Sequence, residues 1–372
     1  MPSVEPLEKP CKWQIGVVGA LGGEFGAVGR PIAQGVELAV ARINAEPQVP
    51  CLIQIHERDS RGRPQRAIRM VRDLLRSKDL VACVCGFFSG ETQAVGAMVA
   101  RRGIPFSGTG PSPLLRAGGF DTWFRAVASD DIQGYVAGRY MARVLKAERI
   151  GIVYVEDGYG RDVARGVVEG VGEKDLLSIG IAPEIPEIKK AVRTIRRFDP
   201  DAVYFAGLLE ESARFARELH RADVNAQFIT SDGAKDPEFG QLAGPGADKA
   251  LASCSCSDPE ALTDPVFYDL YTDEYGEVPG IFTAEIYDVV SFFGAALARA
   301  SPHDPIRRLR ASVVDYLSRG KGLEGVAKTY TWDPRGELKA DPAHVWMYVW
   351  DDSEADFVGI GTVASLMDVT VQ

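Results

Sequence analysis

The chain has 372 residues, of which 46% are hydrophobic and 25% are charged, and its formal net charge at pH 7 is −10. This length suits two domains of moderate size, and the composition excludes a disordered or fibrous protein. The negative charge gives nucleic-acid binding no general support, and no apolar run approaches the roughly 20 residues needed to cross a bilayer.

The start of the chain, MPSVEPLEKPCKW, lacks the basic and then apolar segments of an export signal. Two alternatives stay open here. The protein is cytoplasmic, or the sequence is a processed form or a piece of something larger.

The cysteines lie at positions 11, 51, 83, 85, 254 and 256. We expect them to pack as small buried thiols, because a chain of this size does not need disulfides to fold. Two alternatives are disulfides and a zinc site in which Cys83 and Cys85 meet Cys254 and Cys256. The C-x-C spacing argues against zinc, since zinc-binding pairs are usually separated by two to four residues.

Strand-like and helix-like segments alternate in the first part of the chain. We expect strands at 13–20, 51–59, 80–86 and 104–110, and helices at 30–45, 64–77 and 91–103. Apolar strands that alternate with amphipathic helices are typical of a parallel sheet covered by helices on both faces.

The same rhythm restarts after a helix expected at 129–148. Strands follow at 149–157, 199–207 and 226–233, with helices at 160–173 and 209–223. Two successive α/β units of about 120 residues are more economical than one very large sheet. The predicted fold class is therefore α/β, with two doubly wound parallel-sheet lobes.

The last third of the chain has a different pattern. Helices are expected at 264–276, 282–300 and 305–320, followed by antiparallel strands at 329–339 and 344–350 with a turn at 333–336. Helices that cannot cover a sheet alone must pack on an earlier lobe. We therefore expect the chain to cross between the lobes more than once.

No motif for catalysis or cofactor binding is found. The glycine-rich loop at 19–29 lacks the G-x-G-x-x-G spacing, so we interpret it as a tight turn, and there is no P-loop or nucleophile elbow. The histidines, His56, His220, His303 and His344, form no metal-binding or catalytic pattern. We predict that the protein is not an enzyme and uses no metal or cofactor.

The stretch GFFSGETQ contains several polar residues and lies at the junction between the expected strand at 80–86 and the helix that follows it. Ligands of open parallel sheets collect beyond the carboxyl ends of the strands, where helix N-termini present N–H groups. The Ser89 hydroxyl and the backbone amides near Gly90 suit a carboxylate. The spacing alone leaves two roles for Ser89: a cap for its own helix, or a ligand-binding residue.

Other expected strands end in the same way. Thr109 and Ser112 follow the strand at 104–110, Tyr159 follows the strand at 149–157, and Asp232 follows Ser231 at the end of the strand at 226–233. Both units therefore present polar residues at the corresponding edge of a sheet. Two such edges that face each other would form a cleft.

Together these stretches resemble the type I periplasmic binding proteins of the leucine/isoleucine/valine-binding family, the solute receptors of amino-acid ABC importers. The resemblance runs from about 15 to about 349. It rests on IGVVGALGG with QGVELAVARINA, GFFSGETQAVGAMVARRGIPFSGTG, YVEDGYGRDVARGV, DPDAVYFAG with QFITSDG, and TWDPRGELK.

This resemblance implies a receptor for a small molecule, an amino acid or a similar compound, whose two lobes close on the ligand. Three hinge segments would join lobe 1, at 12–127 and 257–329, to lobe 2, at 128–256 and 330–372, after an N-terminal tail at 1–11. It also implies a monomer without cofactor, an ABC permease as partner and an extracytoplasmic location.

The resemblance further implies roles for single residues. The Ser89 hydroxyl would hold the ligand carboxylate, the backbone carbonyl of Thr109 would accept from the ammonium group, and Asp232 would pair with that group. Tyr159 would close over the ligand, and Phe282 would line the pocket for its side chain.

Some positions depart from the family pattern. Pro111 stands where a Thr usually donates to the carboxylate, and Pro has no N–H, so a donor is lost unless Ser112 or Thr109 replaces it. Leu208 replaces an aromatic hydroxyl and makes the pocket more apolar or more open. Glu285, on a helix beside the expected cleft, is either an additional acid for the ligand or a solvated surface residue.

Other functions were weighed against a transport receptor. A cytoplasmic or fused ligand-sensing domain on the same scaffold is the alternative. A repressor core of the same architecture would need a helix-turn-helix, for which the residues before Trp13 are too few. An amide hydrolase would need a nucleophile–base pair that the sequence lacks.

Overall fold

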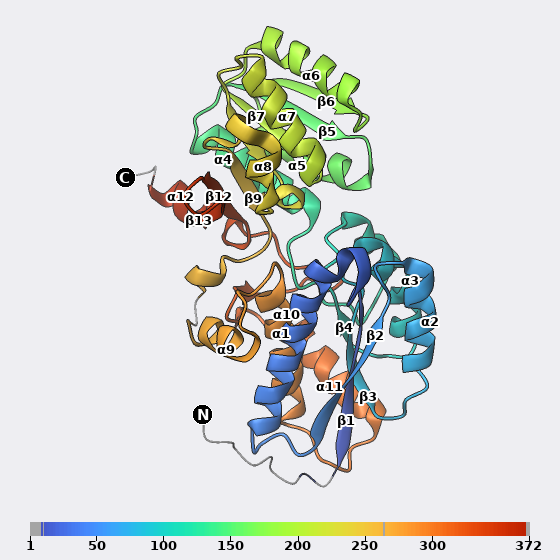
Figure 1. Ribbon diagram of the computed structural model, residues 1–372. Coiled ribbons are helices and arrows are strands. Elements are labelled where there is room, and N and C mark those ends of the chain that lie inside the picture. Colours follow the sequence, from blue (N-terminus) through green and yellow to red (C-terminus); the bar gives the residue numbers. More distant parts are fainter. Residues whose placement is uncertain (1–8, 10, 263–264, 370–372) are drawn as a thin grey trace. The chain divides into compact units, whose positions relative to one another are not determined.

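The computed structural model describes residues 9, 11–262 and 265–369. The chain divides into two compact units, with divisions after Val127, after Cys256 and after Lys339 (Figure 1). Unit 1 contains the first and third segments, and unit 2 contains the second and fourth. The expected N-terminal tail, 1–11, lies outside the described residues except for Lys9 and Cys11.

Unit 1 is built on a four-stranded parallel sheet with the strand order β2-β1-β3-β4. Its strands are β1 (Lys12–Gly19), β2 (Leu52–Asp59), β3 (Leu80–Cys85) and β4 (Phe106–Ser107). Every residue of β3 is buried, as expected for a central strand that helices cover on both faces. The strand expected at 104–110 is shorter than predicted, because the chain turns away through Gly108 and Gly110, and Pro111 has no N–H for a ladder.

Helices cover both faces of this sheet (Figure 1). The helices of unit 1 are α1 (Gly26–Ala45), α2 (Pro64–Leu74), α3 (Ser89–Ala100), α9 (Pro265–Tyr275), α10 (Thr283–Leu297) and α11 (Ile306–Arg319), of which α9 lies outside the layer on the sheet. α2 and α3 pack together and share a hydrophobic core with β3, whereas α1 packs on α10. The late helices thus return to the first unit, as the sequence predicted.

Unit 2 contains a seven-stranded sheet with the order β13-β12-β9-β8-β7-β5-β6. The strands are β5 (Arg149–Val155), β6 (Asp175–Ile181), β7 (Ala202–Ala206), β8 (Gln227–Thr230), β9 (Leu251–Cys254), β12 (Trp346–Asp351) and β13 (Asp356–Thr362). The pairs β6–β5, β5–β7, β7–β8 and β8–β9 are parallel, and β12 is antiparallel to both β9 and β13.

Sequence reasoning missed several elements of unit 2. Its helices are α4 (Asp130–Arg143), α5 (Gly158–Val171), α6 (Ile185–Phe198), α7 (Leu209–Arg221), α8 (Glu238–Ala243) and α12 (Val363–Val369). Neither β6 nor the α6 that follows it was predicted, and β9, β13 and α12 were missed as well. β6 is an edge strand whose side chains are mostly half-exposed, and β9 is only four residues long, so neither carries a strong apolar pattern.

The segment expected as a strand at 329–339 is instead mostly a turn of unit 1. β11 (Thr329–Tyr330) pairs with β10 (Leu323–Glu324), and Trp332 then bridges Leu338 around the turn at Asp333. The Trp332 indole N–H donates to the Arg125 carbonyl at 2.8 Å, and its ring lies edge-on to Phe292. These contacts anchor the segment in unit 1, so the third division falls after residue 339 rather than after the expected residue 329.

Helices α4 and α5 pack against each other with their backbones in close contact. A Cβ atom on Gly166 would lie 2.1 Å from the Asp131 carbonyl oxygen, and one on Gly134 would lie 2.1 Å from that of Val163. Gly138 and Gly170, one turn further along each helix, meet backbone atoms in the same way. Only glycine allows this approach, since any side chain would meet backbone that cannot rotate away.

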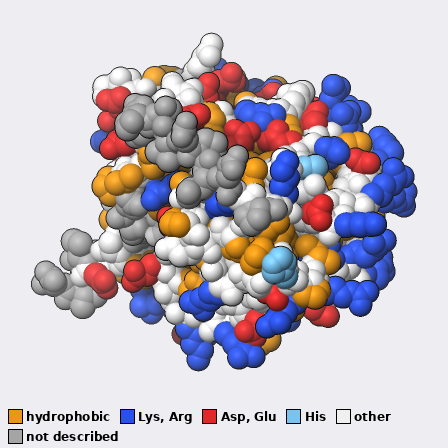
Figure 2. All heavy atoms as spheres, turned by 90° about the horizontal axis from the view of Figure 1, so that it is seen from below, with side chains coloured by type: hydrophobic (Ala, Val, Ile, Leu, Met, Phe, Trp, Pro, Cys, Tyr) orange, Lys and Arg blue, Asp and Glu red, His pale blue; other side chains and the backbone are white. Residues whose placement is uncertain are grey.

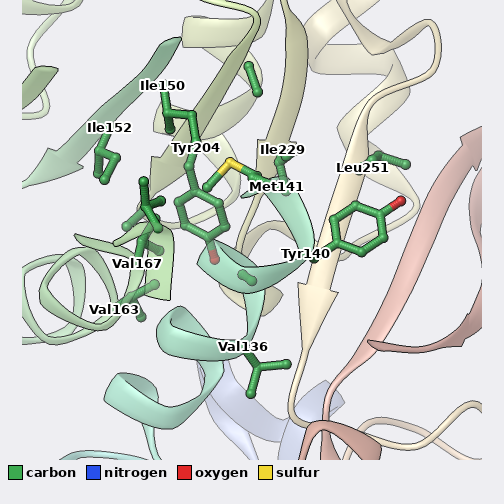
Figure 3. Close-up of a cluster of buried hydrophobic side chains, with 14 of the residues drawn as sticks. Val136, Tyr140, Met141, Ile150, Ile152, Val163, Val167, Tyr204, Ile229 and Leu251 are labelled. Carbon is green, nitrogen blue, oxygen red and sulfur yellow. The ribbon is translucent and has the colours of Figure 1, made fainter. Parts of the chain in front are cut away.

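The same two helices cover the core of unit 2. Figure 3 shows a part of this core, in which side chains of α4 and α5 meet the sheet: Met141, Val163, Val167, Ile150, Ile152, Tyr204 and Ile229. Every one of these side chains is buried. Among the described residues, no helix is both long and apolar enough to span a membrane.

The expectation of free buried thiols is wrong. The sulfur atoms form three disulfides, Cys11–Cys51, Cys83–Cys85 and Cys254–Cys256, so no cysteine is left for zinc. Cys11 and Cys51 directly precede the paired residues Lys12 and Leu52 of β1 and β2, which brings them together. Sequence spacing could not reveal this neighbour relation, because it depends on the strand order.

Candidate functional site

The side chain that caps the N-terminal end of α3 is Glu91 rather than Ser89. The Glu91 carboxylate accepts hydrogen bonds from the backbone N–H groups of Phe87 at 3.2 Å and of Phe88 at 3.1 Å. Burial raises the pKa of Glu91, and these hydrogen bonds oppose the shift. Ser89 therefore does not cap its own helix, and this alternative from the sequence is wrong.

The hydroxyl of Ser89 faces the loop that follows β4. Its oxygen accepts a hydrogen bond from the backbone N–H of Ser112 at 2.9 Å. A Cβ atom on Gly110 would lie 2.9 Å from the backbone N and Cα of Ser89, so the two loops are in direct contact. Gly90 follows Ser89 in the first turn of α3 and is exposed.

The two residues expected to replace the donor missing at Pro111 are placed differently. The Thr109 hydroxyl is buried and donates to the carbonyl of Phe87 at 2.8 Å, so it is directed into unit 1. Ser112 is half-buried and lies beside Ser89, and its hydroxyl accepts from the N–H of Leu114 at 3.3 Å. We therefore expect Ser112, rather than the Thr109 hydroxyl, to act together with Ser89.

A buried arginine that the sequence analysis missed holds this loop in place. Arg125 is fully buried and donates to the carbonyl of Gly110 at 2.5 Å and to that of Ser112 at 3.0 Å. The same guanidinium forms two hydrogen bonds to the carboxylate of Glu337, at 2.8 and 3.0 Å. The only signal in the sequence was an arginine within the apolar stretch WFRAVA, because its partner is 212 positions away.

In unit 2, Tyr159 and Asp232 form one hydrogen-bonded pair. The Tyr159 hydroxyl donates to Asp232 Oδ1 at 2.5 Å and accepts from the N–H of Gly233 at 3.0 Å. Tyr159 lies in the first turn of α5, and Asp232 begins the short 3₁₀ helix at Asp232–Ala234 after β8. Two residues that the sequence placed at the ends of separate strands are thus brought together.

The environment of this pair disfavours negative charge. Burial raises the pKa of Asp232, and hydrogen bonds from Tyr159 and Gln133 oppose the shift. Burial and the nearby charge of Asp232 both raise the pKa of Tyr159. Asp232 is therefore an acid whose charged form would gain from a positively charged partner.

Leu208 lies beside this pair. It is 55% exposed and precedes the first residue of α7. A Cβ atom on Gly233 would lie 3.0 Å both from Leu208 Cδ2 and from the Tyr159 hydroxyl oxygen. The side chain thus adds an exposed apolar surface next to a polar pair.

A buried polar network below the pair was also missed by the sequence analysis. The hydroxyl oxygens of Tyr204 and Ser253 are 2.8 Å apart, and the Gln133 amide donates to the Ser253 carbonyl at 2.9 Å. All three side chains are buried, and burial raises the pKa of Tyr204. Tyr204 and Gln133 lie in segments that read as ordinary strand and helix, so only the fold reveals their connection to Asp232.

The two residues predicted at the start of α10 differ in their surroundings. Phe282 is 8% exposed and has a φ of 64°, a left-handed conformation that is rare for an aromatic residue. Glu285 is 1% exposed, accepts from the N–H of Ser257 at 2.7 Å and pairs with Lys328 at 3.0 Å. The expectation of a solvated Glu285 is wrong, because the helix face that carries it is buried, and we leave it out of the ligand-binding set.

The described residues contain no group of three or more His, Cys, Asp or Glu side chains suited to hold a metal ion. The polar residues predicted for the ligand site instead form a cluster in each unit. The cluster of unit 1 consists of Ser89, Ser112 and the loop held by Arg125, and that of unit 2 consists of Tyr159 and Asp232. The first can donate hydrogen bonds to an anion, and the second can accept them from a cation.

Comparison with known proteins identifies the family. Residues 12–353 match the model of the periplasmic binding proteins, so the chain belongs to this family. It is 27% identical to an amino acid binding protein of Pseudomonas aeruginosa, over 91% of this chain and 90% of the relative. It is 25% identical to the Leu/Ile/Val-binding protein of Escherichia coli K12, over 88% of each chain.

Solved structures share the fold. A leucine-binding protein from Thermotoga maritima matches with a TM-score of 0.76 at 19% identity, covering 93% of this chain and 97% of that one. A solute-binding protein of an ABC transporter from R. palustris, in complex with benzoate, matches with a TM-score of 0.74 at 16% identity, covering 95% and 96%. These similarities establish the type I periplasmic-binding-protein fold, with its two mostly parallel sheets.

Proposed function

We propose that this protein is the solute receptor of an ABC importer and that its ligand is an amino acid or a similar zwitterion. The family match and the names of the relatives support a solute-binding role. The observation that carries the ligand class is the opposite chemistry of the two clusters. Ser89 with Ser112 offers hydrogen-bond donors, and Asp232 offers a carboxylate.

In this proposal the ligand carboxylate binds at the N-terminal end of α3, where Ser89 and the backbone amides near Gly90 can donate. The helix dipole favours an anion there, and each charged hydrogen bond contributes roughly 1.5–3 kcal/mol. The ammonium group binds Asp232 and the carbonyl of Thr109. Tyr159 and Leu208 contact the ligand from unit 2, and Phe282 lines the pocket for its side chain.

The pKa of Asp232 gives this assignment a physical reason. Burial raises that pKa, so the carboxylate is held in an environment that disfavours its charge. An ammonium group would relieve this cost, because an opposite charge at close range favours the ionised form. A ligand that satisfies both clusters also favours whichever arrangement of the units brings both to it, which is how a receptor closes on its solute.

We further propose an ABC permease as the partner, a monomeric receptor and a location outside the cytoplasmic membrane. The Cys11–Cys51 disulfide supports that location, since disulfides persist in oxidising compartments.

The test uses L-leucine and two fragments of it, 3-methylbutylamine without the carboxylate and 4-methylpentanoate without the ammonium group. We expect Asp232→Ala to abolish binding of leucine and of the amine but to leave that of the acid unchanged. Ser89→Ala should weaken leucine and the acid by roughly one to two orders of magnitude, as expected for one charged hydrogen bond, and spare the amine. Isothermal titration calorimetry measures each affinity.

Asp248→Ala, which removes an exposed acid of unit 2, is the matched control and should bind like the wild type. A thermal-shift screen of amino acids, aromatic acids and polyamines comes first, and any compound that stabilises the protein more than leucine takes its place as the test ligand. Unchanged affinity for a zwitterion in Asp232→Ala would disprove the assignment of the ammonium group.

A further inference from the structure

Four of the six residues that line a groove of unit 1 are arginines. The groove is an open hollow of about 580 Å³ at the C-terminal ends of α2 and α3, and its lining residues are Arg72, Leu75, Arg76, Met98, Arg101 and Arg102. Leu75 and Met98 form an apolar floor, because both pack on the hydrophobic core of unit 1. Figure 2 shows Lys and Arg side chains gathered along its right-hand edge, the side on which α2 and α3 lie in Figure 1.

The charge of this groove is only partly compensated. Asp73 forms an ion pair with Arg76 at 3.6 Å, but it also pairs with Arg58 at 2.9 Å. Among the described residues, the guanidinium groups of Arg72, Arg101 and Arg102 have no carboxylate within salt-bridge distance. The ends of the two helices add about half a negative charge each, so the groove keeps a net charge of roughly +2.

This charge contrasts with the rest of the protein. The whole chain has a net charge of −10, so the groove is a local exception rather than part of a basic surface. Like charges repel each other, and four exposed arginines that share a single acid, Asp73, leave a positive potential that attracts anions. The helix dipoles explain why arginines occur in a last turn, but not why four of them line the same hollow.

The groove is separate from the candidate ligand site. Ser89 is the first residue of α3 and Ala100 is the last, so the two ends of the helix are about 16 Å apart at 1.5 Å per residue. The N-terminal end carries Ser89, and the groove lies at the other end.

We propose that this groove is a second binding site, which takes an anion with phosphoryl groups. The planar guanidinium group matches phosphate oxygens in a bidentate arrangement, and several arginines together suit a multivalent phosphate. The apolar floor can take a non-polar part of the same ligand. A soluble phosphate ester and the headgroup of an anionic phospholipid share this chemistry. The proposal goes beyond the amino-acid receptor function and does not depend on it.

The experiment compares two double variants with the same change in charge. Arg101→Glu with Arg102→Glu reverses two charges of the groove. Arg196→Glu with Arg197→Glu reverses two exposed arginines in the last turn of α6, in unit 2, and serves as the control. Calorimetry at low ionic strength measures binding of pyrophosphate, and co-sedimentation measures binding to phosphatidylcholine vesicles with or without phosphatidylglycerol.

We expect the wild type and the control to bind an anionic probe, and the groove variant to bind it roughly 10- to 100-fold more weakly, as for the loss of one or two charged hydrogen bonds. Binding of pyrophosphate identifies a soluble ligand, and binding of only the phosphatidylglycerol vesicles identifies a lipid headgroup. The absence of both, or equal weakening in both variants, overturns the proposal. Leucine binding by the groove variant tests the receptor function separately, and we expect it to be unchanged.

Discussion

In unit 1 a fully buried cation, Arg125, organises the loop beside Ser89, whereas in unit 2 the acid Asp232 is held by a tyrosine hydroxyl. Arg125 donates twice to its acid partner, Glu337, and once to each of two carbonyl groups. Its charge is therefore fully used within unit 1. Within the part of the chain that the structure describes, Asp232 accepts hydrogen bonds from neutral donors alone, and burial raises its pKa.

This difference separates a structural charge from a functional one. A buried ion pair that is complete within the protein fixes the geometry of a loop, and removing one partner leaves the other charge buried and unpaired. An acid that has a raised pKa and accepts hydrogen bonds from neutral donors alone can instead bind a cationic group of a ligand. The two units therefore should respond differently to the loss of a charged side chain.

The largest expected effect is on unit 1. Arg125→Met removes the bidentate partner of the buried Glu337 carboxylate, which keeps only a weaker contact to Arg116 at 3.3 Å, and it also removes the donors to Gly110 and Ser112. We expect the free energy of unfolding to fall by about 3–5 kcal/mol, measured by urea denaturation. The control Arg335→Met removes an ion pair to Asp333 whose arginine is 66% exposed, and should cost less than about 1 kcal/mol.

The double variant Arg125→Met with Glu337→Met removes both buried charges and should recover part of the lost stability. If Arg125→Met costs no more than Arg335→Met, the pair is not structural and the contrast between the units fails.

A smaller effect on stability is expected from the helix packing, which differs between the two units. Gly166→Ala in α5 would place a Cβ 2.1 Å from a backbone carbonyl oxygen, whereas Gly96→Ala in α3 would place one 2.5 Å from the ring of Phe120. A side chain can rotate away, but two helix backbones cannot move apart without opening their interface. We expect Gly166→Ala to reduce the free energy of unfolding by roughly 1–3 kcal/mol and Gly96→Ala to cost less.

Thermal and urea unfolding of both variants measure this difference. Gly158→Ala, in the first turn of α5 with no atom within 4 Å of the added Cβ, should unfold like the wild type. If Gly166→Ala and Gly96→Ala reduce the free energy of unfolding equally, the backbone contact between α4 and α5 does not make Gly166 harder to replace.

The smallest expected effect is on the acid of unit 2. Tyr159→Phe removes a hydrogen bond that lowers the pKa of Asp232, so this pKa should rise further. Because an ammonium ligand needs the ionised acid, its affinity should fall as the pH drops through the pKa, and this fall should begin at a higher pH in the variant. At neutral pH we expect a loss of up to about tenfold.

NMR titration of the carboxyl carbon of Asp232 measures the pKa without any ligand. Tyr135→Phe changes an exposed tyrosine of the same unit and should leave that pKa unchanged. A lower pKa of Asp232 in Tyr159→Phe would contradict the role assigned to this hydrogen bond.

Much of the fold could be predicted because apolar patterns are local. β1, β3, β5 and β7 are runs of mostly buried residues, and the helices between them show one apolar face. The prediction failed at β6, whose side chains are mostly half-exposed, and at the segment 329–339, where two aromatic rings pack back onto unit 1. Neither the edge position of β6 nor that packing leaves a local pattern.

The candidate site divides in the same way. Ser89 and Asp232 were identified because polar residues at the ends of apolar strands are visible in the sequence. Arg125, Gln133 and Tyr204 were missed, since their importance depends on partners distant in the chain, such as Glu337 for Arg125. The solvated alternative for Glu285 failed, because α10 is buried on nearly all sides and has no clear polar face.

Local patterns of residues were enough to predict the α/β class, the order of most strands and helices along the chain, and the places where polar residues follow a strand. These properties depend on the spacing of apolar and polar residues over a few turns. The tertiary structure alone decided which cysteines are bonded, that Arg125 and Glu337 form a buried pair, and that four arginines of α2, α3 and their C-terminal ends line one groove. Such relations join residues far apart in the chain, and only the order of the strands and the packing of the helices bring them within contact distance.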